Sequence, residues 1–169
     1  MLEQALNSAR LLYAYTLHID APLSDVFRLT GEPENWTRDY DGKPFENLAL
    51  VWDGPRYKPG SKMTLTPLRK DGSPSYIGAV SMQLLHYEKN AELSYRYLSG
   101  NHLIYRFVYE AMTPTRTEFT VNALVDGQSS PINSLRQRMY AGRRRKAAIK
   151  DHLRVKNELE YRAAQAGRK

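Results

Sequence analysis

The run of cations at residues 143–146, three arginines followed by a lysine, is the first feature of the sequence that suggests chemistry. Such a run can bind nucleic acid, form the solvated face of a helix, or place one cation in a ligand site. Four successive helical residues turn through about 300°, so they cannot all face solvent once the helix packs against another element. Which of them points inward depends on the element that carries them.

A helix through this run carries an apolar stripe on one face, made of Leu135, Met139, Gly142, Ile149 and Leu153. Lys146 falls in the middle of the stripe, whereas Arg144 falls on the opposite face and is expected to point into solvent. Two roles for Lys146 stay open: its ammonium reaches water at the rim of the packed face, or it faces a ligand, where a desolvated amine can act as a base. Met139 and Gly142 would then line the same site, Gly142 by leaving space.

Four histidines are the other candidates for proton transfer, and they are His18, His86, His102 and His152. No two of them have the spacing of metal ligands on a helix, and the chain has no cysteine, so no metal site is expected. The sequence also lacks a glycine-rich phosphate loop and the motifs of serine hydrolases and zinc proteases. We therefore expect no cofactor, and each histidine is either a general base or an ordinary surface residue.

The positive charge is concentrated in one segment. The chain has 169 residues and a net charge of +7, but residues 132–169 alone carry 12 Lys or Arg and 3 Asp or Glu. Aromatic residues do not alternate with these cations as a single-stranded nucleic-acid site requires, so nucleic acid is an unlikely partner and an acidic acyl carrier protein fits better. No apolar run reaches the ~18 residues of a membrane span and no export signal begins the chain, which favours the cytoplasm.

The elements that would position these residues follow from periodicity and turn residues. Residues 11–20 predict a strand, 22–36 two short helices, and 131–165 one long helix. The strands expected between them cover 46–54, 61–68, 76–89, 92–100, 102–112 and 116–127. Short connections favour antiparallel pairing, so residues 1–169 predict one α+β domain with a curved seven-stranded sheet wrapped around the long helix, as a monomer or a homodimer.

The opening "YTLHIDAPLSDVFRLTGEPENW" (15–36) combines a strand, an Ala-Pro step, a Val-aromatic pair and Pro-x-x-Trp. With the order of elements, it resembles the START-like or helix-grip superfamily (SRPBCC type), which includes polyketide cyclase/dehydrase and birch-pollen-allergen-like proteins. The resemblance implies a largely apolar cavity between sheet and helix that holds a lipid, hormone or polyketide. The superfamily includes both enzymes and pure binders.

The aromatase/cyclases of that superfamily, enzymes of antibiotic biosynthesis, imply specific positions. The resemblance places Trp36 in the cavity and a Ser-x-Arg pair at Ser81 and Gln83 of a middle strand. Gln83 stands where the arginine would be, and a neutral amide cannot act as an acid. A catalytic role for Ser81, Gln83 and Lys146 is therefore an expectation that departs from the mechanism of those cyclases.

Period-two alternation assigns the remaining candidates for ligand binding, which are Tyr40, Trp52, Met63, Tyr95, Tyr97, Tyr105, Phe107, Tyr109 and Phe119. The tyrosines supply apolar walls with a few hydroxyl groups, provided that Arg96 and Arg106 occupy the opposite face. We expect a protein that binds a small hydrophobic or aromatic molecule, as a polyketide cyclase or dehydratase that positions its substrate. The alternatives are a non-catalytic carrier and an interaction protein that uses its basic helix.

Overall fold

The computed structural model describes residues 2–75, 77–98, 103–127 and 129–166. Seven strands in these ranges form one antiparallel sheet in the order β1-β7-β6-β5-β4-β3-β2. The strands are β1 (Arg10–Ile19), β2 (Leu48–Asp53), β3 (Lys62–Pro67), β4 (Val80–Glu88), β5 (Glu92–Tyr97), β6 (Leu103–Thr113) and β7 (Arg116–Val125). The helices are α1 (Leu2–Ser8), α2 (Leu23–Thr30), the 3-10 helix η1 (Pro33–Thr37) and α3 (Pro131–Ala166). The predicted order of elements is confirmed from β1 to α3.

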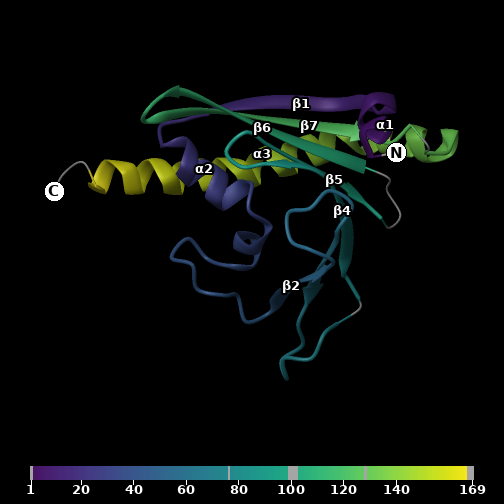
Figure 1. The fold of residues 1–169 in the computed structure, drawn as a ribbon, viewed down its shortest axis with the longest axis horizontal. Helices are drawn as coiled ribbons and strands as arrows, with labels where there is room; N and C mark the ends of the chain where they lie inside the picture. The colour runs from purple at the N-terminus through teal and green to yellow at the C-terminus, as the bar shows by residue number, and fades with distance from the viewer. Residues whose placement is uncertain (1, 76, 99–102, 128, 167–169) are drawn as a thin grey trace.

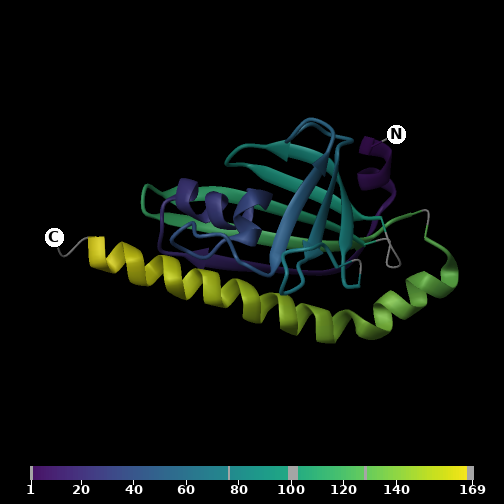
Figure 2. The same cartoon turned by 90° about the horizontal axis from the view of Figure 1, so that it is seen from below.

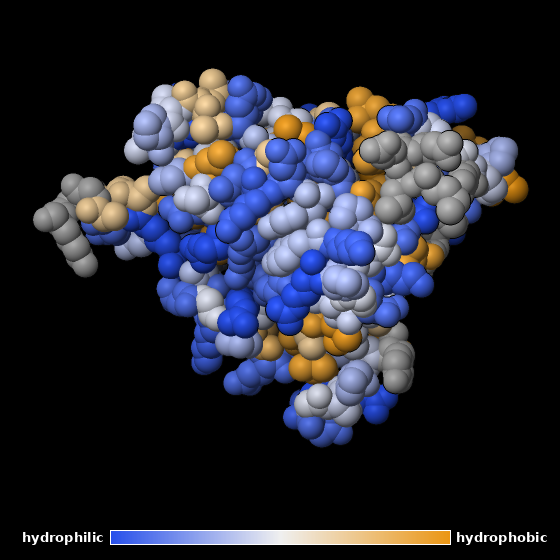
Figure 3. All heavy atoms as spheres, viewed as in Figure 1, coloured by the Kyte–Doolittle hydropathy of each residue, from blue (hydrophilic) through white to orange (hydrophobic). Residues whose placement is uncertain are grey.

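The long helix α3 runs along one face of the sheet, which curves around it (Figures 1 and 2). Helices α2 and η1, which follow β1, lie on the same side of the sheet (Figure 2). Hydrophilic residues dominate the face of the molecule shown in Figure 3, and hydrophobic ones gather near the end of the sheet that carries β2. Among the described residues, no helix is both long enough and apolar enough to cross a membrane.

The main core lies between the sheet and its helices. Its sheet residues include Tyr13, Tyr15, Met63, Met82, Leu84, Tyr95, Phe107, Tyr109, Phe119 and Val121. Helix α2 adds Val26 and Phe27, both fully buried, and a methyl group on Gly31 would lie 2.7 Å from the Phe27 ring. The close approach at Gly31 lets the chain turn from α2 into η1, which brings Trp36 beside the sheet.

Helix α1 was not predicted. It covers the opposite face of the sheet, where Ala5 packs with Leu85 and Ile104. A shift of register between Leu84 and His86 in β4 interrupts the alternation there, and both Leu84 and Leu85 are buried. Seven residues give too short a pattern for a helix to be read from periodicity.

The predicted inward face of α3 is wrong. Leu135, Met139 and Leu153 are 62%, 74% and 38% exposed, and a methyl group on Gly142 would meet open space. Only Ile149 of the predicted stripe packs against the core, from its flank. The face turned toward the sheet consists of Gln137, Ala141, Arg144, Ala148, His152, Val155 and Leu159.

This orientation of α3 follows from the sheet face that it covers. That face is crowded with tyrosines, so two small residues, Ala141 and Ala148, let the helix approach. The tyrosine hydroxyls need polar partners, which a stripe of leucine and methionine cannot supply. The helix instead presents His152 to Tyr15 and leaves Leu135, Met139 and Leu153 outside.

Candidate functional site

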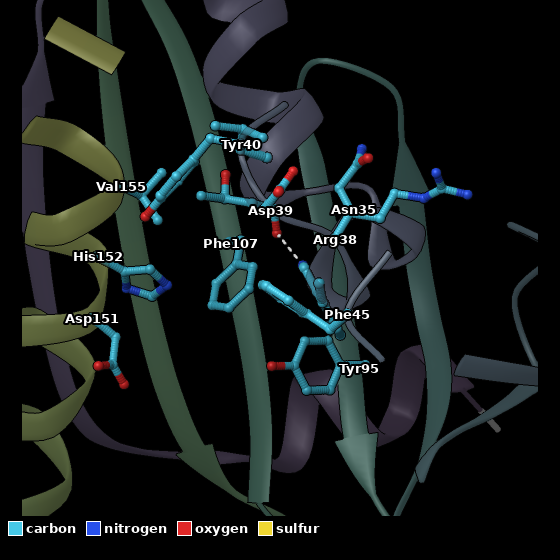
Figure 4. A pocket seen from close by; sticks show the side chains of 13 residues that line it. Asn35, Arg38, Asp39, Tyr40, Phe45, Tyr95, Phe107, Asp151, His152 and Val155 are labelled. Carbon is cyan, nitrogen blue, oxygen red and sulfur yellow. Dashed lines mark hydrogen bonds between the residues drawn. The ribbon is translucent and has the colours of Figure 1, made fainter. Parts of the chain in front are cut away.

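The cavity that best fits a ligand lies between η1, the loop of residues 38–45, strands β5 and β6, and α3. It has a volume of about 460 Å³. Its lining is Leu29, Thr30, Asn35, Trp36, Arg38, Asp39, Tyr40, Phe45, Tyr95, Phe107, Asp151, His152 and Val155. Figure 4 shows Phe107 and Tyr95 on the strands, with His152 pointing toward them from α3.

Aromatic rings form the walls of this cavity. The centroid of Tyr95 lies 5.4 Å from that of Trp36 and 5.8 Å from that of Phe107. The indole N–H of Trp36 donates to the Thr30 carbonyl at 3.1 Å, so its polar atom is satisfied and its ring is held in place. Tilted and edge-to-face aromatic contacts of this kind suit flat, apolar ligands.

His152 supplies an imidazole at the α3 side. Its Nδ1 lies 2.5 Å from the Tyr15 hydroxyl, and its ring meets Phe107 and Phe119 edge-on, with centroids 5.8 and 5.0 Å away. Burial among these rings lowers the pKa of His152 to about 4, although the neighbouring Asp151 carboxylate acts in the opposite direction. The imidazole is therefore neutral at pH 7.

The Tyr15 hydroxyl fixes which nitrogen of His152 carries the proton. Burial raises the pKa of Tyr15 well above its ordinary value, so the hydroxyl keeps its proton. Nδ1 is the acceptor that Tyr15 reaches within the described part of the chain, so the hydroxyl donates to it. The remaining proton of the neutral ring then sits on Nε2.

The loop of residues 38–45 closes the cavity on the side away from the sheet. The Asp39 carboxylate accepts hydrogen bonds from the backbone N–H groups of Asp41 and Lys43, at 3.0 and 2.8 Å. Arg162 of α3 donates to the Tyr40 carbonyl at 3.1 Å and to the Asp41 carboxylate at 2.9 Å. These contacts tie the loop to the helix, so Tyr40 and Phe45 are held over the cavity.

A second cavity, of about 370 Å³, lies further along α3. Tyr97 and Tyr105 face Arg144 across it, and Asp151 lines both cavities. Arg144 was expected to point into solvent, but it is half-buried and donates to the Gln137 side chain. Arg144 was predicted to face solvent because the inward face was assigned to Leu135, Met139 and Leu153, which in fact lie on the exposed side of α3.

Comparison with known proteins rests on structure alone, because no protein-family model and no curated protein sequence matches the chain. The Zhui aromatase/cyclase from Streptomyces sp. R1128 superposes with a TM-score of 0.58 at 15% identity, covering 94% of this chain and 98% of that one. The Polyketide_cyc-like protein Cgl2372 from Corynebacterium glutamicum gives 0.54 at 15%, covering 89% and 90%. This chain has the START-like, helix-grip fold. One further neighbour, the di-domain ARO/CYC StfQ of the steffimycin biosynthetic pathway, gives 0.58 at 14%, with 96% of this chain and 55% of that chain covered.

The helix-grip cavity contains several residues that the sequence predicted. Trp36, Tyr40, Tyr95 and Phe107 line it. Tyr97 and Tyr105 line the neighbouring cavity instead. The other predicted core-facing residues, Met63, Tyr109 and Phe119, are buried in the main core beneath these cavities.

Trp52 lies outside both cavities. Its indole N–H donates to the Glu34 carboxylate at 3.0 Å, and its ring lies 5.7 Å from that of Tyr57. Tyr57 also donates to Glu34. Glu34 thus joins η1 to β2 and the loop after it, and Trp52 serves that junction.

Ser81 and Gln83 also lie outside the cavities, on the face of β4 opposite the buried Met82 and Leu84. The Ser81 hydroxyl lies 3.0 Å from that of Thr64. Gln83 donates to the Gly60 carbonyl at 3.0 Å and accepts from Arg96 at 2.9 Å. The resemblance to the Ser-x-Arg pair predicted a role in the cavity for both residues, but their side chains lie on the sheet face that does not contact it.

The outer face of α3 carries the other misplaced candidates. Met139, Gly142 and Lys146 are exposed there, and Lys146 borders a shallow depression with Leu153 rather than either cavity. The interpretation of Lys146 as an inward cation is therefore wrong in this structure. The physical reason is that the sheet face under α3 is crowded with tyrosines, so alanines and a histidine pack against it better than the predicted stripe of larger residues.

Of the histidines, only His152 lines a described cavity. His18 lies on the opposite sheet face, 3.1 Å from Glu118, and His86 lies near Glu88. His102 lies outside the described residues. Within the described ranges, no three His, Cys, Asp or Glu side chains cluster in a way that could hold a metal ion.

The sequence offered one signal that would have found the inward face. Residues 137, 141, 144, 148, 152, 155 and 159 follow one another at steps of three or four, the spacing of one face of a packed helix. Only two of the seven are large aliphatic residues, so a hydrophobicity count passes over them. Phe45 was missed for a different reason, since nothing in the sequence indicates that the loop folds back over the sheet.

The buried neutral state of His152 predicts a dependence of stability on pH. The unfolded chain binds a proton at His152 near pH 6.5, whereas the folded chain binds it only near pH 4. The resulting stabilisation is therefore complete above pH 6.5 and is lost as the pH falls toward 4, by about 2 to 3 kcal/mol. Urea unfolding of His152→Gln should show a shallower fall than the wild type between pH 7 and 4.5. His18→Gln, at an exposed histidine, should keep the wild-type slope, and equal slopes in all three proteins would contradict the assignment.

Proposed function

We propose that the protein binds a small, flat, hydrophobic or aromatic molecule in the cavity between η1, β5, β6 and α3. The observation that carries the proposal is the set of aromatic walls, Trp36, Tyr95 and Phe107, around one neutral imidazole. A cavity of about 460 Å³ lies within the range of small-molecule sites, and such sites are mostly apolar with a few placed polar groups. The 38–45 loop, held by Arg162, would shield one side of the ligand from water.

The same geometry supports a cyclase-like role, in which the protein holds a flexible poly-β-keto chain in a reactive shape. Aromatic walls restrict the conformations of such a chain, and this positioning alone can supply much of the rate enhancement. Two of the structural neighbours carry the printed name aromatase/cyclase or ARO/CYC, which favours this role over others. The alternative is a carrier that binds without chemistry, since Ser81 and Gln83 lie away from the cavity.

A second candidate function is docking of an acidic partner protein, such as an acyl carrier protein, on the outer face of α3. The observation that favours it is the exposed pair Leu135 and Met139, flanked by the exposed cations Arg136, Arg138 and Arg143. Apolar residues that stay exposed beside a high density of one charge are typical of an interface with a complementary surface. Two copies of this face would repel each other, so the charge favours a partner of opposite sign.

Ligand binding is tested with the two tryptophans as a matched pair. Trp36→Leu removes a cavity wall and should weaken binding of a bicyclic or tricyclic aromatic compound about tenfold, because it loses both stacking and buried area. Trp52→Leu should leave the affinity within twofold of the wild type, since Trp52 serves the Glu34 junction. Isothermal titration calorimetry with 2-naphthol as the probe measures the affinity of the wild type and of each variant. Equal losses in the two variants, or no binding to the wild type, would refute the proposed site.

Docking on α3 is tested by charge reversal. The double variant Arg138→Glu, Arg143→Glu should weaken binding to a polyketide acyl carrier protein at least tenfold and flatten its salt dependence. The matched control, Arg69→Glu with Lys70→Glu, reverses two exposed charges in the turn between β3 and β4. Surface plasmon resonance at 50 and 300 mM salt measures the affinity of each double variant for the carrier protein. A similar loss of affinity in both would mean that only net charge matters.

A further inference from the structure

Three polar side chains that line the cavity, Asn35, Arg38 and Asp39, are engaged by their own neighbours. Asn35 donates to the Arg28 carbonyl at 2.6 Å and to Glu32 at 3.1 Å. Arg38 donates to the Gly42 carbonyl at 2.8 Å, and Asp39 accepts two backbone N–H groups of its loop. These hydrogen bonds hold the three side chains in the wall of the site.

His152 differs from these three residues. Its Nδ1 is occupied by the Tyr15 hydroxyl, while no hydrogen bond to its Nε2 exists among the described residues. The ring points from α3 into the cavity, toward Phe107 (Figure 4). Because Tyr15 donates to Nδ1, the proton of the neutral ring is on Nε2, which places an N–H donor beside the aromatic walls.

We infer that His152 recognises a neutral acceptor oxygen of the ligand, such as the carbonyl of an aromatic ketone, through a hydrogen bond from Nε2–H. This inference rests on the proposed function and names the chemical class that the cavity prefers. A donor that a bound ligand covers without offering a partner costs free energy, so a ligand that supplies an acceptor gains over one of the same shape that does not. The Asp151 carboxylate, which lines the cavity beside His152, disfavours a carboxylate ligand and so favours a neutral oxygen.

The Tyr15 contact makes this recognition specific to one hydrogen-bond polarity. For Nε2 to present a lone pair, Nδ1 would have to donate to Tyr15, and the Tyr15 hydroxyl proton would lose the acceptor that it reaches within the described part of the chain. The ring contacts with Phe107 and Phe119 hold the imidazole plane against rotation. Ligands whose only polar group is a hydrogen-bond donor therefore gain nothing at this position.

The test uses 1-tetralone and tetralin, two bicyclic probes that differ by one carbonyl oxygen. Their dissociation constants are measured by calorimetry for the wild type, for His152→Leu and for the control His18→Leu, whose side chain lies on the other face of the sheet. The ratio of the tetralin constant to the tetralone constant should be about fivefold larger in the wild type than in His152→Leu, in line with one hydrogen bond. The control should keep the wild-type ratio.

The outcomes separate this inference from the proposed function. If neither probe binds the wild type, the proposed function fails. If both bind and His152→Leu leaves the ratio unchanged, the cavity stands and the role of His152 is overturned. Should His152→Leu fail to fold, the wild type decides by NMR: the ¹H resonance on Nε2 of His152 should move downfield with 1-tetralone and stay in place with tetralin. Equal shifts with the two probes would overturn the inference.

Discussion

The crowding of tyrosines on one face of the sheet is the constraint on which the rest of the structure depends. Tyr13, Tyr15, Tyr95 and Tyr105 bring rings that fill the space under α3 and hydroxyls that need partners. Tyr13 and Tyr105 bond to each other, with hydroxyl oxygens 3.1 Å apart, whereas Tyr15 turns to His152. Bulky aliphatic residues at the facing positions of α3 could neither approach the tyrosines nor satisfy them, so α3 presents Ala141, Ala148 and His152 there. Leu135, Met139 and Leu153 stay outside.

This constraint links the fold to the candidate site. The residue that satisfies Tyr15 on α3 is the same one that gives the cavity its polar group, so one hydrogen bond both orients the helix and sets the proton position on His152. The second tie between helix and site is Arg162, which holds the 38–45 loop over the opposite side of the cavity. Helix α3 thus positions the cavity from two points about three turns apart along its length.

The sequence predicted the fold more fully than the site, and particular residues explain why. Turn residues and period-two alternation located the strands, and Tyr95 and Phe107 followed correctly from that alternation because it is a local property of a strand. Which face of α3 points inward is not a local property, because it depends on the side chains that the sheet presents to the helix. A prediction based on the hydrophobicity of Leu135 and Met139 therefore selected the wrong face. The sequence likewise gave no sign that Gln83 would be used by Gly60 and Arg96, or that Phe45 would cover the cavity.

The absence of cysteine from the sequence makes the orientation of α3 directly measurable. Single cysteines at Met139 and at Ala148, introduced one at a time, report the exposure of the two faces through their rates of reaction with a water-soluble maleimide. The account predicts that Met139→Cys reacts at least tenfold faster than Ala148→Cys in the folded protein and that the rates become equal in urea. A faster reaction at position 148 would mean that the aliphatic stripe faces the sheet, and would contradict both the cavity and the role of His152.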